Sequence, residues 1–537
     1  MTTAAPRRPL SSLLEPPPIR EVHAPRWFER QPQWLTTGGF VVLLVIISAV
    51  LRSRQLGGEL WFNEAISTGI AGHSLSELPG ILRQAGTSPL YYVLLHIWMS
   101  VVGSSESDTH VLSLLIGLAT IPVGMWSGWS LYGRRAGFYA AVLFAFNSFL
   151  TRYAQETQMY ELMVLLGLLC TTGFLHAFVY RRRSYLWLFG VSLALLTYTQ
   201  AAGFLFWFGA AVALGVVYRF TPAEARRALL RDAGISFAAV AIVYLPWLPT
   251  TISQIAHATS PFHYAPLSGA DVPSDLLGGE RVDVTLLVAC VIGVAPLLAP
   301  ERRRTSDAIA IWALVALAFS AIALSRVIGL FAEAWVARYF ASLIPALLLL
   351  STLLAARARV VGLVAIVLCV AFLANPGSFA AAHKSDMRDV AGELAPLLHQ
   401  GDLVVVAQPE QVPLAYYYLP AGLRWASTIG AVAHPTYMRW TNALGRLQAA
   451  SPKATLTPLV ASLRPGQQLL FVRPLTEGVE NWKASWTQLV RRRSAQWGAL
   501  LQSAVTAGTL QRVARAPHYY PSACCVADSA ILYRKAS

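Results

Sequence analysis

Two carboxylates lie close to apolar segments of this chain and are the residues best suited to acid–base chemistry. Glu64 follows Asn63 in the segment Leu60–Ala65, just beyond the first long apolar run, and Glu156 lies about ninety residues later in Tyr153–Tyr160. Charged side chains near lipid are costly and therefore indicate function. A carboxylate in such a loop can take a proton from a hydroxyl group as a general base. The alternative for the first pair is structural, because Asn63 would cap a helix and Glu64 would lie favourably in its first turn.

The composition is that of a membrane protein. Of the 537 residues, 55% are hydrophobic and 13% are charged, and the mean hydropathy is +0.51. Soluble domains carry about 25% charged residues. The net charge of +15 is concentrated in short loops, so it indicates membrane orientation and no nucleic-acid partner. Residues 1–35 are rich in Pro and Arg and are predicted to be a disordered tail.

Eleven apolar runs predict membrane-spanning helices, although several are shorter than the usual length of about 20 residues. The runs are 36–52, 109–132, 136–151, 159–180, 185–200, 201–218, 233–250, 284–299, 307–327, 336–356 and 359–375. The apolar stretch 88–103 is ambiguous. If it does not cross, nineteen Arg residues lie on the side of the N-terminus and seven on the other; if it crosses, the numbers are nine and seventeen. Because Lys and Arg accumulate in cytoplasmic loops, this stretch is predicted to stay outside as a juxtamembrane or re-entrant helix.

This topology predicts a mainly α, multi-pass protein of the plasma membrane with a cytoplasmic N-terminus. The loop 53–108 and the loop around Glu156 then share the outer compartment with everything from residue 376 onward. Residues 36–375 would form the membrane domain and 376–537 an extracytoplasmic α/β domain. In that domain the pattern predicts strands at 403–407, 468–472 and 531–533, and helices at 386–399 and 482–500.

Five motifs resemble those of one family. Leu60–Ala65 is similar to Trp-x-Asp-Glu-Ala, Ser88–Tyr92 to Pro-Pro-Leu-Tyr-Tyr, and Tyr153–Tyr160 to Tyr-Ser-Gln-Glu-Ala-Arg-x-Tyr. Ala337–Tyr339 matches an Arg-Tyr motif, and Lys384–Ala391 is like the opening of an outer domain. Together, from about residue 36 to 420, they resemble the GT-C fold glycosyltransferases that use polyprenyl-phosphate sugars. This group includes the protein O-mannosyltransferases, the aminoarabinose transferase and actinobacterial cell-wall transferases.

The resemblance implies an inverting sugar transfer. A base takes a proton from the acceptor, the hydroxyl oxygen attacks the anomeric carbon, and polyprenyl phosphate leaves through an oxocarbenium-like transition state. By analogy the sugar is of the arabinose or mannose class, and the acceptor is an envelope glycan, lipid or protein. No cofactor is required by the sequence; a divalent metal ion is left open, and no metal ligands are identified.

Two positions depart from the family pattern. Asn63 stands where the family has its catalytic Asp, and Gln158 stands where it has an Arg. An amide can neither act as a base nor neutralise a phosphate, so either Glu64 or Glu156 would take the base role. The alternative is a catalytically inactive binding or assembly protein of the cell envelope.

The leaving phosphate needs cations or hydrogen-bond donors. Arg338 with Tyr339 is a candidate, because the guanidinium fork binds phosphate in a bidentate manner; the alternative is an interfacial anchor at the headgroups. Arg83 and Arg152 are further candidates, although an exposed Arg beside a membrane is by default only solvated.

Aromatic residues and one histidine complete the predicted site. Tyr91, Tyr92 and Tyr160 are candidates for substrate contacts, and the alternative for the first two is an aromatic belt at the membrane surface. Because adjacent helical residues point to different faces, at most one of Tyr91 and Tyr92 is expected to face a pocket while the other meets lipid. His73, in the same loop, could bind phosphate or a metal, although a lone histidine usually does neither.

Overall fold

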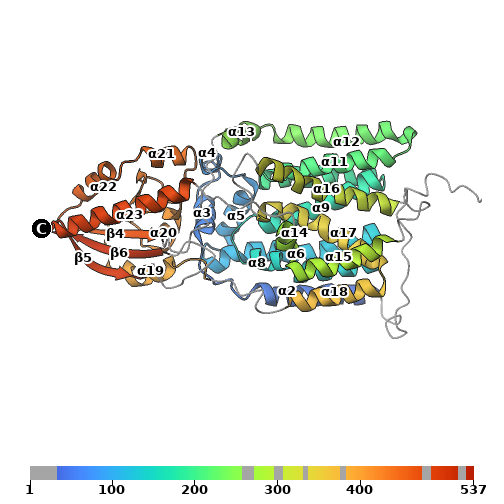
Figure 1. Ribbon diagram of the computed structural model, residues 1–537, viewed down its shortest axis with the longest axis horizontal. Coiled ribbons are helices and arrows are strands. Elements are labelled where there is room, and N and C mark those ends of the chain that lie inside the picture. The colour runs from blue at the N-terminus through green and yellow to red at the C-terminus, as the bar shows by residue number, and fades with distance from the viewer. Residues whose placement is uncertain are drawn as a thin grey trace, which may run out of the picture.

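The computed structural model describes residues 33–256, 271–295, 306–329, 337–374, 383–474, 485–517 and 528–536. The predicted disordered tail, 1–35, lies almost entirely outside the described residues. Two parts follow one another along the longest axis: a bundle of apolar helices and a smaller α/β domain at the C-terminal end (Figure 1). The chain is thus mainly helical, as its composition predicts.

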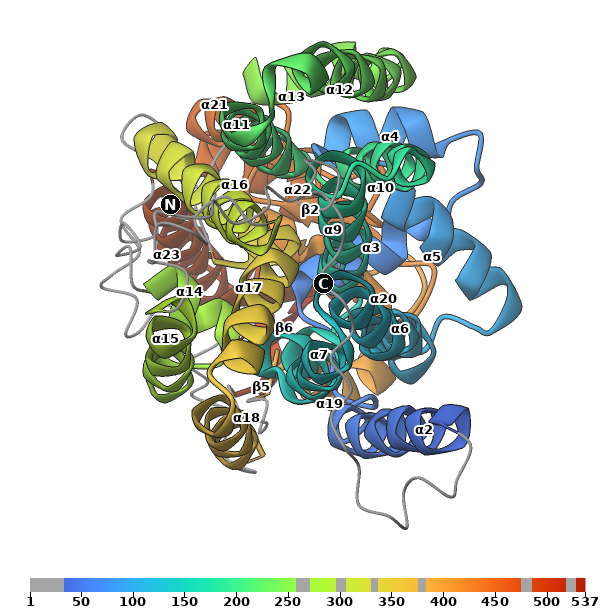
Figure 2. The same cartoon turned by 90° about the vertical axis from the view of Figure 1, so that its right-hand side faces the viewer.

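Where the structure describes them, all eleven apolar runs are largely helical. The helices are α2 (Gln33–Arg52), α6 (Glu106–Tyr132), α7 (Arg134–Phe146), α9 (Tyr160–Phe174) with the π-helical turn η2 (Leu175–Val179), α10 (Leu186–Thr199), α11 (Gly203–Phe220), α12 (Ala223–Tyr244), α15 (Glu280–Val294), α16 (Ser306–Gly329), α17 (Ile344–Arg357) after the 3-10 turn η6 (Ala337–Leu343), and α18 (Val360–Leu373). Seen end-on, α9 and α17 lie inside the bundle, while α2, α12 and α18 lie at its edge (Figure 2). The apolar runs therefore pack side by side into one body.

The described residues contain five helices that are long and apolar enough to cross a membrane, by length and composition. They are α6, α9 with η2, α11, α16, and η6 with α17. A sixth span results if α12 and α13 (Leu248–Ala256), bent by 74° at their junction, count as one. Other helices are shorter: α7 has 13 residues and reaches about 20 Å at 1.5 Å per residue, against a hydrocarbon core of about 30 Å. The protein is a polytopic membrane protein, and the crossing of all eleven runs stays a prediction.

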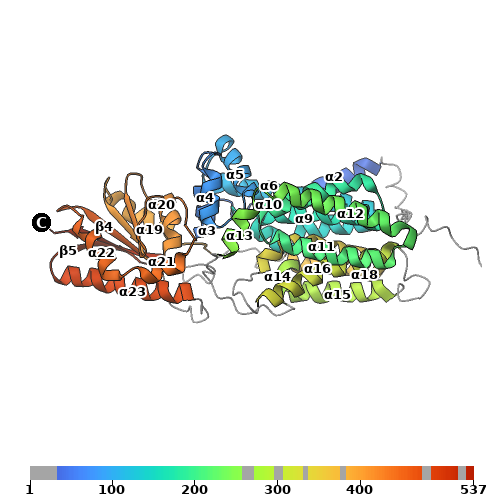
Figure 3. The same ribbon diagram turned by 90° about the horizontal axis from the view of Figure 1, so that it is seen from above.

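Three short helices fill the predicted loop between α2 and α6. They are α3 (Phe62–Ala71), α4 (Leu78–Ala85) and α5 (Leu90–Val101). Figure 3 shows all three between the bundle and the C-terminal domain. At 12 residues, α5 extends over about 18 Å, which is too short to cross a bilayer. This length agrees with the placement that the Arg distribution predicts for 88–103.

The C-terminal domain contains a six-stranded sheet with the order β3-β2-β1-β4-β6-β5. The strands are β1 (Leu403–Val406), β2 (Arg424–Ser427), β3 (Gly430–Ala431), β4 (Gln468–Pro474), β5 (Leu510–Ala516) and β6 (Asp528–Lys535). β1 is parallel to β2 and β4, whereas β6 is antiparallel to β4 and β5. The helices are α19 (Met387–Leu394), α20 (Val412–Tyr418), α21 (Ala443–Ala449), α22 (Pro452–Ala461) and α23 (Ser485–Thr506). The three predicted strands are confirmed as parts of β1, β4 and β6.

Close helix packing in the bundle depends on glycine, and this gives a first prediction. A Cβ atom at Gly209 of α11 would lie 2.3 Å from the carbonyl oxygen of Leu317 in α16, whereas a Cβ at Gly215 of the same helix meets nothing within 4 Å. We therefore expect Gly209→Ala to force α11 and α16 apart and to cost about 1–3 kcal/mol, as overpacking does. Gly215→Ala should leave stability unchanged or raise it slightly, since Ala has the higher helix propensity. Thermal unfolding midpoints in detergent check this, and equal midpoints for the two variants would contradict it.

Candidate functional site

The candidate site lies where three segments far apart in the sequence meet at one end of the bundle. They are the N-terminus of α3, the turn Ala154–Met159 between α8 (Ser148–Tyr153) and α9, and the segment Lys384–Asp386 just before α19. Hydrogen bonds join all three, because Glu64 accepts from both the Thr157 backbone N–H and Lys384. The sequence motifs thus converge in space.

Glu64 is fully buried, and four donor groups lie within hydrogen-bonding distance of its carboxylate. It is the third residue of α3, and its Oε2 accepts from the Trp61 backbone N–H at 3.1 Å. Oε1 lies 2.7 Å from His110 Nε2 and 2.8 Å from the Thr157 nitrogen. Lys384 Nζ lies 3.1 Å from both carboxylate oxygens. Helix position and tertiary contacts together fix this side chain.

These contacts make Glu64 a weak base. Burial raises the pKa of its carboxyl group, but the charges of Lys384 and His110 and the hydrogen bonds from His110 and Thr157 outweigh it, so the pKa falls to about 2. A carboxylate that is ionised so readily has little tendency to take a proton near neutral pH. The geometry therefore favours a structural role for Glu64.

Asn63 does not cap this helix, so that part of the structural alternative was wrong. The residue before the first helical turn is Trp61, with extended backbone angles. Asn63 lies inside the first turn, half-buried, and its carbonyl oxygen accepts from Ser67 Oγ at 3.0 Å. The predicted position of Glu64 in the first turn is confirmed.

Glu156 has a different environment. Its side chain is only 7% exposed, and among the described residues its Oε2 has no hydrogen-bond partner. Oε1 lies 3.8 Å from Arg152 Nε. Burial and the charge of Glu64 raise the pKa of this carboxyl group, while Lys384, Arg152 and Arg338 act against the rise. A buried carboxylate with a raised pKa and one oxygen without a partner is suited to accept a proton.

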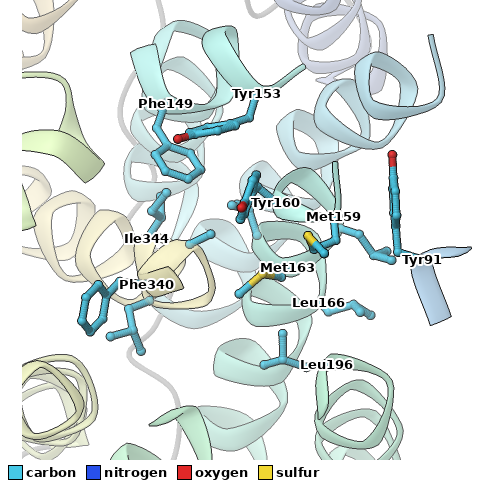
Figure 4. Packing of buried hydrophobic residues seen from close by; sticks show 14 of the residues in the cluster. Tyr91, Phe149, Tyr153, Met159, Tyr160, Met163, Leu166, Leu196, Phe340 and Ile344 are labelled. Carbon is cyan, nitrogen blue, oxygen red and sulfur yellow. The ribbon is translucent and has the colours of Figure 1, made fainter. Parts of the chain in front are cut away.

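Arg338 lies in η6. Burial raises the pKa of the Glu156 carboxyl and of the Tyr153 phenol, and the charge of Arg338 acts against both rises. Its guanidinium also lies 5.5 Å from the centre of the Trp61 ring. The rings of Tyr153 and Tyr160 pack edge to face with centres 4.7 Å apart (Figure 4). The structure therefore places a partly buried cation, several aromatic rings and a carboxylate together, with Tyr339 next in the chain.

The other predicted residues divide into near and distant groups. Arg152 is 60% exposed beside Glu156, and Gln158 is buried, with Nε2 donating to Ser67 Oγ at 3.0 Å. Arg83 is exposed on α4. His73 Nε2 lies 2.8 Å from Thr436 Oγ1 of the C-terminal domain, so it belongs to the contact between the two parts.

The prediction that one of Tyr91 and Tyr92 meets lipid was wrong. Their exposed fractions are 0% and 4%. The two residues do point to different faces of α5, but the helix packs against α3, α6 and α10, so both faces are covered. Tyr92 also accepts a hydrogen bond from Thr87 Oγ1 at 3.1 Å.

Sequence reasoning did not identify Lys384 and His110 as site residues. Lys384 is 6% exposed, and His110 lies fully buried in α6, with Nδ1 2.7 Å from the Leu56 carbonyl oxygen. Lys384 stood in a recognised motif, and a lysine beside an acidic outer loop was a signal that could have been used. The only feature of the sequence that points to His110 is the presence of a histidine within an apolar run.

Two further buried charged side chains were also missed. Arg52, at the end of α2, and Glu161 of α9 are both fully buried. A Cβ at Gly117 of α6 would lie 2.6 Å from Glu161 Oε2 and 3.0 Å from Arg52 Nη1, so both charges face this glycine. Arg52 Nη2 donates to the Phe144 carbonyl oxygen at 2.6 Å. Glu161 lies in the first turn of α9, directly after the turn that carries Glu156.

No metal-binding group is evident in the part of the chain that the structure describes: no three His, Cys, Asp or Glu side chains there lie close enough to hold an ion. What the described site offers is a carboxylate, a guanidinium and hydrogen-bond donors.

Helices of this arrangement, with short helices and an α/β domain at one end, define the GT-C fold that the motifs predict. ArnT from Cupriavidus metallidurans bound to undecaprenyl phosphate has a TM-score of 0.61 and 13% identity, and covers 93% of this chain and 98% of its own. In the apo state the same protein has a TM-score of 0.58. The archaeal oligosaccharyltransferase AglB from Archaeoglobus fulgidus, in complex with an inhibitory peptide and a dolichol-phosphate, has a TM-score of 0.56 and 13% identity, over 87% of this chain and 72% of its own. At these identities the likeness concerns the fold.

Sequence comparison gives no closer relation. No family model matches the chain, and no curated protein matches it in sequence.

Proposed function

We propose that this protein is a membrane glycosyltransferase that moves a sugar from a polyprenyl-phosphate donor to an acceptor hydroxyl, with inversion. The observation that carries the proposal is the buried Glu156 carboxylate beside the Arg338 guanidinium. This arrangement supplies a base and a phosphate ligand at one place. Two proteins of the same fold have been solved with undecaprenyl phosphate and with dolichol-phosphate, which supports a lipid phosphate as the donor.

In the proposed reaction Glu156 takes the proton of the acceptor hydroxyl. The oxygen forms a bond to the anomeric carbon as the bond from that carbon to the phosphate oxygen breaks. The phosphate leaves with the electron pair, and Arg338, with Arg152 at the exposed rim, stabilises its charge. A single displacement of this kind inverts the configuration. Glu64 stays ionised and orders the turn.

The site is proposed to face the outside of the plasma membrane, because the Arg distribution places the loop 53–108 and the C-terminal domain there. By analogy with the family, the sugar is proposed to be of the arabinose or mannose class. The acceptor would be an envelope glycan, lipid or protein.

Transfer of labelled sugar from synthetic polyprenyl-phosphate donors to envelope-extract acceptors tests the proposal. Purified wild-type protein should turn over at least one such donor, and the product should have inverted configuration. Absence of transfer with every donor, in protein that still binds polyprenyl phosphate, would reject the enzyme.

The second candidate function is a binding or assembly protein of the envelope. It is favoured by Asn63, which offers no carboxylate, and by Gln158, whose amide already binds Ser67. If this function is correct, the wild type will show no transfer and Asn63→Asp will gain it, because the restored carboxylate can act as a base. Under the enzyme proposal, wild-type protein is active and Asn63→Asp adds no more than a small change.

A further inference from the structure

The C-terminal domain places a single ammonium group inside the site. Lys384 is 6% exposed, and its Nζ lies 2.7 Å from the Gln155 carbonyl oxygen and 3.1 Å from each oxygen of Glu64. Gln155 belongs to the turn that carries Glu156, and Glu64 belongs to α3. One side chain of the C-terminal domain therefore fastens two elements of the bundle together.

The same turn also has supports from the bundle. Gln158 Nε2 donates to Ser67 Oγ at 3.0 Å, and Ser113 Oγ donates to the Gln158 carbonyl oxygen at 3.4 Å. Thr157 N–H donates to Glu64 at 2.8 Å, and Thr157 Oγ1 donates to Thr109 Oγ1 at 2.9 Å. The Gln155 side chain donates to the Thr151 carbonyl oxygen at 2.8 Å and accepts from the backbone N–H of Gln55, which follows α2, at 2.9 Å. Lys384 and Thr157 share Glu64 as an acceptor, so this lysine, together with His110 and the Trp61 backbone N–H, holds the carboxylate to which Thr157 binds.

The ammonium is delivered by a docked segment. The backbone N–H of Lys384 donates to Glu59 Oε1 at 2.7 Å, and Ser385 Oγ donates to the Leu60 carbonyl oxygen at 2.7 Å. Arg388 donates to Glu106 Oε1 at 2.6 Å. Figure 3 shows α20 next to the short helices at this end of the bundle, where it packs against α3. A buried lysine that loses its partners leaves a charge without compensation, so these contacts stabilise one another.

The groups that face Glu156 come from six elements. They are Glu64 of α3, Arg152 and Tyr153 of α8, Arg338 of η6, Tyr160 of α9, Tyr91 of α5, and Lys384. Glu64 and Lys384 act on the pKa of Glu156 in opposite directions while both are charged. Without Lys384, the charge of Glu64 is opposed at Glu156 only by Arg152 and Arg338.

We propose that Lys384 is a positioning residue through which the docked C-terminal domain sets both the shape of the turn Ala154–Met159 and the charge beside Glu156. The bundle alone is then not a competent transferase. This inference rests on the proposed function, since it assigns the domain a role in the same site.

The pH dependence of transfer tests the charge component. With Glu156 as base, turnover falls as the pH drops through the pKa of its carboxyl group. Lys384→Met removes one of the cations that lower the pKa of Glu156, so this acid limb moves to higher pH. Turnover at neutral pH falls roughly 10- to 100-fold because the turn is misplaced. Glu64→Gln moves the limb to lower pH. In the double variant the limb returns toward its wild-type position, and Lys453→Met, at an exposed lysine of α22, changes neither rate nor limb.

Hydrogen exchange of the turn 153–160 tests the positioning component without any need for turnover. Faster exchange in Lys384→Met, with Lys453→Met like wild type, supports the inference even if no donor is accepted and the proposed function fails. The double variant also serves if Lys384→Met does not fold, because it removes the unpaired charge. Unchanged exchange in folded Lys384→Met, or acid limbs that shift in the same direction in Lys384→Met and Glu64→Gln, would overturn the inference.

Discussion

Glu156→Gln is expected to lower kcat by roughly 10²- to 10⁴-fold, the contribution of a positioned general base, while donor binding is kept. The amide preserves the shape of the side chain and cannot take a proton. Among the described residues, Glu156 Oε2 has no hydrogen-bond partner, so the substitution breaks no described bond at this oxygen. Steady-state transfer rates, with binding of the donor measured separately, check the result.

The matched controls are two other glutamates of the same region. Glu77→Gln, at an exposed side chain with an accessible fraction of 59%, should leave transfer unchanged. Glu64→Gln should reduce it without abolishing it, because Glu64 supports the turn and is too weak a base to act itself. If Glu64→Gln is inactive and Glu156→Gln retains wild-type kcat, the two roles must be exchanged.

The pH profile gives an independent check on the same residue. Burial and Glu64 raise the pKa of the Glu156 carboxyl above its usual range near 4.5. Only the ionised form is a base, so activity should rise with pH through this raised pKa and then level off. On acidification, activity should therefore be lost at a higher pH than it would be with an exposed glutamate. A profile that is flat down to about pH 4.5 would show that another group takes the proton.

The elements were predictable because their signals are local. Each apolar run became a helix, and Leu403–Val406, four consecutive apolar residues, became the fully buried strand β1. Strand β5 was missed, since its residues Leu510–Ala516 include two arginines and are largely exposed at the edge of the sheet. The local hydrophobic pattern indicates which residues are buried, and an edge strand has few buried residues.

The site was only partly predictable because its decisive contacts are not local. The motifs identified Glu64 and Glu156 as candidates, but both carry the same functional group and the sequence left the base open. What separates them is Lys384, 320 residues from Glu64 along the chain. The pairing lowers the pKa of one carboxyl and leaves the other without strong partners, and no spacing in the sequence expresses that.

Arg338→Met is expected to weaken binding of the polyprenyl-phosphate donor by roughly 10- to 100-fold, in line with about 1.5–3 kcal/mol for hydrogen bonds to a charged group. The guanidinium lies over the Trp61 ring and beside Glu156, so it is held next to the proposed position of the anomeric carbon. Loss of this cation should also lower kcat, because the leaving phosphate gains charge in the transition state. Donor titration and kcat/KM measure the two effects.

Arg338→Lys separates the two roles that the sequence left open for this residue. A phosphate ligand needs the planar fork, which an ammonium lacks, so the lysine variant should recover only part of the affinity. An interfacial anchor needs only a positive charge on a long apolar stem, so the lysine variant would then behave like wild type. Arg326→Lys, at an exposed arginine in the last turn of α16, is the matched control and should change nothing. Full recovery in Arg338→Lys would assign the residue to anchoring, and the phosphate would have to be held by other groups, of which Arg152 lies beside Glu156.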